Sequence, residues 1–263
     1  MRHLQGHPQN LPQPPPRTGW VPSIGAGLLP ILIRVGAFGL IYPHNQTCED
    51  RLSIPVGRPM LKAHSIACVR GDRLLFQDLS LEIGAGEACQ VQGHNGVGKT
   101  TLLRILCGLS LPESGEVLWN GTSIHQDSGK FQSDLTYIGH SNGVKLDLTP
   151  RENLAFALTL QSSTPNASID DALERVGLST SQHLLCRVLS AGQRRRVAIA
   201  RLYLSRAPLW VLDEPLGAID AAGVQGIENA IETHLDQGGM AILTTHQPLR
   251  LQQAAIRAVH LDN

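Results

Sequence analysis

Three short stretches of the chain carry side chains that suit phosphate chemistry. They are GHNGVGKT at 93–100, LWVLDEP at 209–215 and MAILTTH at 240–246. The first is rich in glycine, and glycines let backbone N–H groups curl around phosphate oxygens. The other two are apolar runs that end in polar residues. Together they predict a site that binds a nucleoside triphosphate through its phosphates.

The glycine-rich stretch stands in the sequence context of a P-loop. A short apolar-rich run at 87–92 precedes it, and residues 101–109 follow with the apolar periodicity of a helix. A helix N-terminus adds its positive dipole end to such a site. We expect Lys99 to reach the β- and γ-phosphates and the Thr100 hydroxyl to ligate Mg²⁺. The residues expected to contact the nucleotide are Gly93, His94, Asn95, Gly96, Val97, Gly98, Lys99, Thr100 and Thr101.

The two apolar runs predict buried parallel strands, and ligands in α/β sheets bind at the carboxyl ends of such strands. Asp213 is therefore placed to hold Mg²⁺, partly through water, and Glu214 to polarise the water that attacks the γ-phosphate. His246 falls on the same edge and can hydrogen-bond a γ-phosphate oxygen. The alternatives are that the two acids only begin a loop and that the histidine is structural.

The remaining elements surround these motifs. Residues 61–81 read as strands, and residues 135–138 as another. Thr149 followed by Pro150 marks a helix start, with Ser168 capping a second helix. Ser190 caps an arginine-rich helix that ends at Leu204. Arg194–Arg196 read as its solvated face or, alternatively, as a contact with lipid headgroups or a partner.

The segment Leu189–Gln193, LSAGQ, lies between the P-loop and the strand that ends in Asp213. This order of motifs resembles the ATPase subunit of ABC transporters, over about residues 60–263. The resemblance implies an α/β fold of the P-loop NTPase class, an ABC nucleotide-binding domain. Such a domain has a RecA-like core lobe, an antiparallel β-subdomain and a helical lobe, here at about 141–188. It also implies ATP and Mg²⁺ as ligands.

The same resemblance implies a head-to-tail dimer of two copies of the chain. ATP on one P-loop would be covered by Ser190, Gly192 and Gln193 of the other copy. The segment Gly217–Asp220 matches the D-loop, which places Asp220 at the subunit interface.

Two positions depart from the family pattern. His140 stands where the Q-loop glutamine is expected, and imidazole is a poorer partner for Mg²⁺ than an oxygen ligand. The aromatic residue that stacks on adenine, expected near Val69 or Arg70, is absent. We therefore expect aliphatic packing and Arg70 to contact the base, with modest selectivity for ATP over GTP.

Four segments resemble one subfamily, the ATP-binding subunit of the cytochrome c maturation (haem exporter) system. They are Ile138–His140, Gly115–Gly121, Leu189–Ala198 and Thr244–Leu249. The resemblance implies an ATPase that drives haem export or release of the haem-loaded chaperone. Its partners would be an integral-membrane haem exporter subunit and a haem-handling membrane protein, at the cytoplasmic face of the bacterial inner membrane. The alternative is the ATPase of another small ABC transporter.

Composition bears on the rival classes. The formal net charge is zero, which argues against a nucleic-acid partner bound by bulk positive charge.

Ten of the 16 prolines fall in residues 1–59, which we interpret as a disordered tail or a mis-assigned start before Met60. Five cysteines without CxxC spacing favour free thiols. A soluble kinase would not need the segment Leu189–Gln193, and an ABC protein of translation or DNA repair would usually carry two cassettes.

Overall fold

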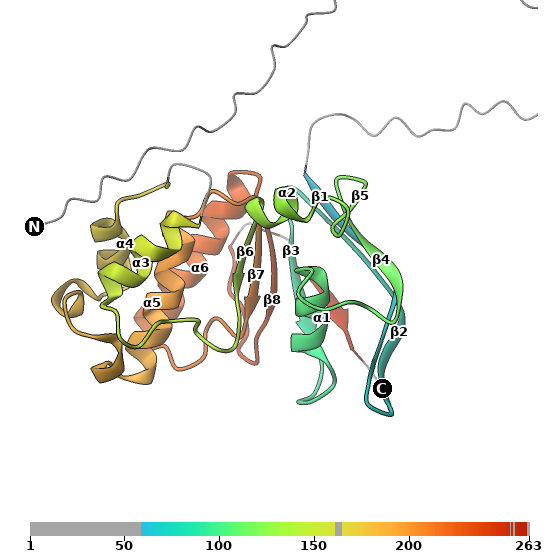
Figure 1. Cartoon of the computed structure of the whole chain (residues 1–263), viewed down its shortest axis with the longest axis horizontal. Helices are drawn as coiled ribbons and strands as arrows, with labels where there is room; N and C mark the ends of the chain where they lie inside the picture. The colour runs from blue at the N-terminus through green and yellow to red at the C-terminus, as the bar shows by residue number, and fades with distance from the viewer. Residues whose placement is uncertain (1–58, 161–164, 253, 255, 262–263) are drawn as a thin grey trace, which may run out of the picture. The chain divides into compact units, whose positions relative to one another are not determined.

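The computed structural model describes residues 59–160, 165–252, 254 and 256–261. The interpretation of residues 1–59 as a disordered tail or a mis-assigned start therefore concerns residues outside the described part of the chain, with the exception of Pro59. Within that part, the elements form two sheets with helices on either side of the larger one (Figure 1).

The smaller sheet is antiparallel and has the order β2-β1-β4-β5. Its long strands alternate buried and exposed residues, and Leu61, Ala63 and Ile83 point into the core. Such alternation is what a sheet with one covered face requires. The strands are β1 (Met60–Arg70), β2 (Arg73–Gly84), β4 (Ser114–Trp119) and β5 (Thr122–Ser123).

The larger sheet is parallel throughout and has the order β6-β7-β8-β3-β9. Two of its interior strands, β7 and β8, are buried at every position, as expected of strands covered on both faces. Their register pairs Asp213 with Thr244. The strands are β3 (Ala88–Gln92), β6 (Leu135–Ile138), β7 (Leu209–Asp213), β8 (Met240–Thr244) and β9 (Ile256–His260).

Helices cover both faces of the parallel sheet. Helix α1 (Lys99–Leu106) lies between the two sheets, while α5 (Ala191–Leu204) and α6 (Ala221–Asp236) lie on the opposite face (Figure 1). Outside α5 stand α3 (Pro150–Thr159) and α4 (Ile169–Arg175), and α2 (Ser128–Ser133) precedes β6. Two 3₁₀ turns, Ser179–Ser181 and Cys186–Val188, complete the helical region.

The helix starts follow the sequence signals. Thr149, Ser168 and Ser190 each form a capping box, in which the hydroxyl accepts from the backbone of the third helical residue and that residue's side chain accepts from the cap backbone. Two otherwise unpaired donors are satisfied at each helix start. The predicted starts at Thr149 and Ser168 are therefore confirmed.

Two hydrophobic clusters pack on opposite faces of the parallel sheet. One fills the space between the sheets around α1, and the other joins α5, α6 and the helical region. The second cluster runs from Leu154 and Leu173 through Val197 to Leu212, so α5 connects the helical region to the sheet. Among the described residues, no helix combines the length and apolarity that crossing a membrane requires.

Candidate nucleotide site

The carboxyl ends of β3, β6, β7 and β8 meet beside one open cavity. Its volume, about 830 Å³, suits a nucleotide-sized ligand. Ten of the predicted site residues line this cavity: Asn95, Gly96, Gly98, Lys99, Thr100, Thr101, His140, Asp213, Glu214 and His246. Residues from four separate segments of the sequence therefore come together as the motif order predicts.

The loop after β3 depends on glycine for its shape. Gly93 has a φ of 146°, and a Cβ there would lie 2.8 Å from the Leu261 carbonyl oxygen. The Lys99 ammonium donates to the carbonyl oxygens of Gly93 at 2.8 Å and His94 at 3.2 Å, which fixes it over the loop. The Val97 side chain is buried beneath the loop, so only its backbone can face a phosphate.

A chain of hydrogen bonds fixes the buried carboxylate of Asp213, which is 2% exposed. The Thr100 hydroxyl donates to Oδ2 at 2.8 Å, and the Thr244 hydroxyl donates to Oδ1 at 2.8 Å. The carboxylate of β7 is thus joined to the start of α1 and to the end of β8. These hydroxyl and carboxylate oxygens are the ligand types that Mg²⁺ prefers.

Glu214 turns the chain out of the sheet. Its backbone is left-handed, with a φ of 50°, a conformation that costs a residue with a Cβ about 1–2 kcal/mol. Its N–H donates to the Thr244 hydroxyl at 2.9 Å. The His246 N–H donates to Oε2 at 3.3 Å, and the His246 ring Nε2 lies 3.5 Å from Oε1. The carboxylate is therefore held beside the cavity and remains partly exposed.

The part of the cavity lined by the β1–β2 hairpin is cationic. Arg70 and Arg73, which flank the turn between β1 and β2, line it together with Leu75. Among the residues that line the cavity, no aromatic side chain stands on the β1–β2 hairpin. Arg70 therefore lines the same cavity as the loop 93–100, and its contact with the base stays a prediction.

The interpretation of Arg194–Arg196 as a solvated face is wrong. Arg195 is 5% exposed, and its guanidinium donates to the carbonyl oxygens of Asp213 and Glu214. Arg194 donates to the Leu189 carbonyl oxygen at 2.7 Å, and Arg196 pairs with the Asp220 carboxylate at 2.7 Å. Each of the three arginines is therefore bound to a neighbouring segment, and Arg195 alone reaches the end of β7.

Sequence reasoning missed two residues that shape the site, Arg195 and Thr244. Thr244 stands at the end of an apolar strand beside Asp213, so its position in a parallel sheet was the available signal. Arg195 had no comparable signal, because the segments that bind it are remote in the sequence.

The sequence profile of ABC transporters matches residues 76–217. The chain belongs to the ABC transporter family. Curated relatives extend the match over residues beyond that profile. The cytochrome c biogenesis ATP-binding export protein CcmA of Tatumella citrea is 49% identical over 202 residues, which are 77% of this chain and 96% of that protein. The proteins of the same name from Escherichia coli K12 and Dechloromonas aromatica are 47% and 46% identical, and the matches cover 96% and 100% of their lengths.

Solved structures agree on the ABC fold. An ABC transporter ATP-binding protein from Pyrococcus furiosus superposes with a TM-score of 0.64 at 25% identity, covering 77% of this chain and 97% of that one. A bacterial Atm1-family ABC exporter with ATP bound gives a TM-score of 0.65 at 23% identity, covering 73% of this chain and 35% of that one. The chain is thus an ATP-binding, ATP-hydrolysing subunit of the ABC type. Such ATPases generally dimerise and associate with membrane subunits.

The ABC signature segment lies apart from the cavity of its own chain. Ser190 and Gln193 hold each other in the capping box of α5, with bonds of 2.9 and 3.1 Å. A Cβ on Gly192 would lie 2.8 Å from the Ala218 carbonyl oxygen, so the D-loop packs directly on the signature. Asp220 caps α6 by accepting from the Gly223 N–H at 3.0 Å. None of the four predicted dimer residues lines the cavity in this chain.

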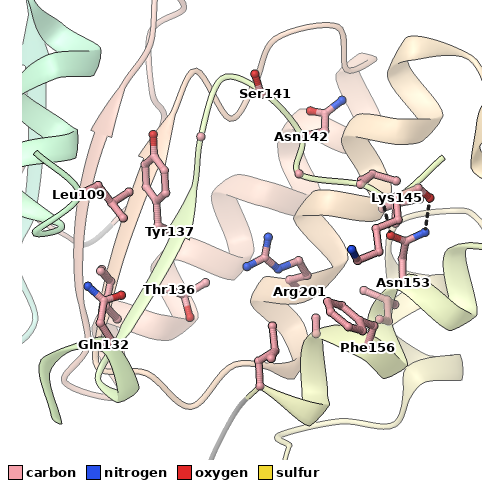
Figure 2. Close-up of a pocket in the computed structure, with 18 residues that line it drawn as sticks. Leu109, Gln132, Thr136, Tyr137, Ser141, Asn142, Lys145, Asn153, Phe156 and Arg201 are labelled. Atoms are coloured by element: carbon pink, nitrogen blue, oxygen red, sulfur yellow. Dashed lines mark hydrogen bonds between the residues drawn. The ribbon is translucent and has the colours of Figure 1, made fainter. Parts of the chain in front are cut away.

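A second cavity, of about 530 Å³, lies between the segment after β6 and helix α3 (Figure 2). Phe156, 44% exposed, and Leu160 form part of its apolar rim. The Lys145 ammonium lies 4.6 Å from the centre of the Phe156 ring. The Asn153 side chain accepts from the Lys145 N–H and donates to the Lys145 carbonyl oxygen, which ties the loop to α3. We call this cavity the α3 groove.

Proposed function

We propose that this chain is the ATP-hydrolysing subunit of an ABC membrane complex for cytochrome c biogenesis. ATP binding and hydrolysis would drive haem export or release of the haem-loaded chaperone. The observation that carries the proposal is the 46–49% identity to CcmA proteins along nearly their whole length. The cavity supports an ATPase, because ten of the residues predicted to bind or hydrolyse ATP line it in one chain.

In this proposal, the loop and Lys99 bind the β- and γ-phosphates of ATP, and Thr100 and Asp213 hold Mg²⁺. Bound Mg²⁺ supplies charge neutralisation on the phosphate oxygens. Glu214 accepts a proton from the water that attacks the γ-phosphorus, and the bond from that phosphorus to the bridging oxygen breaks to give ADP and phosphate. His246 orients the Glu214 carboxylate, and His140 hydrogen-bonds the water or a γ-phosphate oxygen.

A second copy completes the site. Ser190, Gly192 and Gln193 lie at the N-terminus of a 14-residue helix, whose dipole and backbone N–H groups suit a γ-phosphate. Because they do not line the cavity of their own chain, we infer that they cover ATP bound to the partner copy. Asp220 would then lie at the dimer interface.

The α3 groove is the proposed dock for the integral-membrane haem exporter subunit. Its exposed apolar rim matches the kind of surface that a helix covers. A haem-handling membrane protein would join the complex through that subunit, and the chain would sit peripherally on the cytoplasmic face of the bacterial inner membrane. No nucleic acid is part of this proposal.

The test is to isolate membranes from cells that express the tagged full chain and to identify the integral subunit that co-purifies. We expect a cytochrome c biogenesis membrane protein; recovery of another transporter's subunit would contradict the assignment. Phe156→Asp should lower the recovered subunit about tenfold, because a charge would face an apolar contact. Leu184→Asp, an exposed leucine outside the groove, is the matched control and should change recovery little.

A further inference from the structure

Arg195 connects three parts of the molecule that the sequence keeps far apart. From its place in α5, one guanidinium nitrogen donates to the Gly139 carbonyl oxygen at 2.8 Å and the Asn142 side-chain oxygen at 3.1 Å. The other donates to the carbonyl oxygens of Asp213 and Glu214, both at 2.8 Å. Four acceptors are therefore held by one planar group.

The acceptors flank the residues proposed for hydrolysis. Gly139 directly precedes His140, and the two carbonyls of β7 and its exit bracket the turn at which Glu214 adopts its left-handed backbone. A strained turn persists only where the surroundings fix it from several sides. Arg195 holds the carbonyl oxygens of this turn, and the Thr244 hydroxyl accepts from the Glu214 N–H.

Filling space in the core does not explain why an arginine is buried at position 195. Burial lowers its pKa, and the nearby Asp213 and Glu214 carboxylates oppose that shift. Burying a guanidinium is costly unless its donors are used, and an apolar side chain fills space at less cost. Three of the four hydrogen bonds go to main-chain oxygens that the backbone fixes, which matches the rigid fork of arginine and not the single ammonium of lysine.

We propose that Arg195 is a positioning residue that couples the start of α5 to the Glu214 turn and to segment 139–142. The proposal rests on the role of Glu214 proposed above. Because α5 also carries the signature segment at its N-terminus, a shift of that helix would move the Glu214 carboxylate and His140 together. The predicted loss is in the rate of hydrolysis and not in nucleotide binding, since Arg195 does not line the nucleotide cavity.

The test uses the full chain and compares Arg195→Gln, Arg195→Lys and Asn142→Ala. ATP hydrolysis is measured per bound nucleotide, together with the KM for ATP and the thermal midpoint. We expect Arg195→Gln to lower kcat about tenfold or more, with KM changed less than about threefold, because only the transition state needs the aligned carboxylate. Arg195→Lys should recover part of that loss.

Asn142→Ala removes one acceptor and leaves the buried arginine in place, so it tests the coupling even if the Arg195 variants fold poorly. It should lower kcat a few-fold and lower the thermal midpoint by only about 2–4 °C, because one donor of a buried group loses an acceptor. Combined with Arg195→Gln, it should add little, as expected of residues that act as one unit. The matched control is Arg201→Gln: Arg201 is also largely buried on α5, but makes no hydrogen bond to segments 139–142 or 213–214.

Two outcomes separate this proposal from the one it rests on. If Glu214→Gln hydrolyses ATP at the wild-type rate, the general-base assignment and the positioning role both fail. If Glu214→Gln is inactive while Arg195→Gln and Asn142→Ala keep kcat within twofold per bound nucleotide, only the positioning role is overturned. The positioning role would also be overturned if the loss of hydrolysis in the Arg195 variants were matched by an equal loss of folded protein and of nucleotide-binding sites.

Discussion

The hydroxyl of Thr244 donates to Oδ1 of Asp213 across two neighbouring parallel strands, at 2.8 Å. The same hydroxyl accepts from the Glu214 N–H at 2.9 Å. One small side chain at the end of β8 therefore fixes both acidic residues at the end of β7. The two strands bring together groups that have no fixed spacing in the sequence.

Thr244→Val tests this relationship. The substitution keeps the shape of the strand residue but leaves a buried carboxylate oxygen without its donor, a loss of about 1–3 kcal/mol in stability. We expect a lower thermal midpoint and a kcat reduced about tenfold. Thr233→Val, which removes a hydroxyl bonded only to Asn229 of the same helix, is the control. Wild-type hydrolysis by the β8 variant would show that Thr244 does not position the acids.

Glu214→Gln should stop hydrolysis and leave ATP bound. The amide cannot accept the proton of the attacking water, so the ATP-bound dimer should accumulate. Size-exclusion chromatography with ATP and Mg²⁺ should show a shift from one copy to two, while Glu116→Gln on the exposed face of β4 behaves as wild type. A variant that stays monomeric at saturating ATP would instead favour a kinase-like enzyme.

Nucleotide selectivity should be low, because the part of the cavity lined by the β1–β2 hairpin offers Arg70, Arg73 and Leu75. We expect the ratio of kcat/KM for ATP over GTP to stay below about a hundredfold. Arg70→Tyr should tighten binding of both nucleotides about fivefold or more, since stacking on an aromatic ring is indifferent to the base. Equilibrium titrations with both nucleotides measure this, and a much larger ATP preference would count against the cationic base site.

Acid should destabilise the fold through His234. Its ring stacks on Trp210 at 3.9 Å between centroids, and burial lowers its pKa to about 4 from an ordinary 6.5. Between these values the unfolded chain binds the proton and the folded chain does not. Stability is therefore complete above pH 6.5 and falls as the pH drops to 4, by the order of 3 kcal/mol. Denaturant unfolding at several pH values measures the slope.

His234→Phe supplies the control for that slope. It keeps a ring against Trp210 but cannot bind a proton, so this component of the pH dependence should vanish. Parallel stability curves for the two proteins between pH 4 and 6.5 would contradict the role of the histidine.

The segment 60–263 should fold and bind nucleotide alone. All predicted nucleotide-site residues lie within it, and both hydrophobic clusters are made from it. Circular dichroism and nucleotide titration of the shortened chain should match those of the full chain. Failure of the shortened chain to fold would reject the interpretation of residues 1–59 as a separate tail.

The sequence predicts those parts of the site that depend on contiguous residues. Glycine spacing predicts the loop 93–100, and local capping residues predict the helix starts at Thr149 and Ser168. It does not predict Arg195, whose run of three arginines looks like a solvated face. The sequence does not predict strand β9 either. This strand is short, lies at the edge of the sheet and shows no regular alternation of burial.

The contacts of Arg195 have a consequence for sequence variation. Three of its four acceptors are main-chain carbonyl oxygens, which every amino acid supplies. Substitutions at 139, 213 or 214 therefore leave these acceptors in place, and we expect co-variation with position 195 chiefly at position 142. Suppressors of an Arg195 defect should likewise arise at Asn142, the one acceptor that a mutation can change.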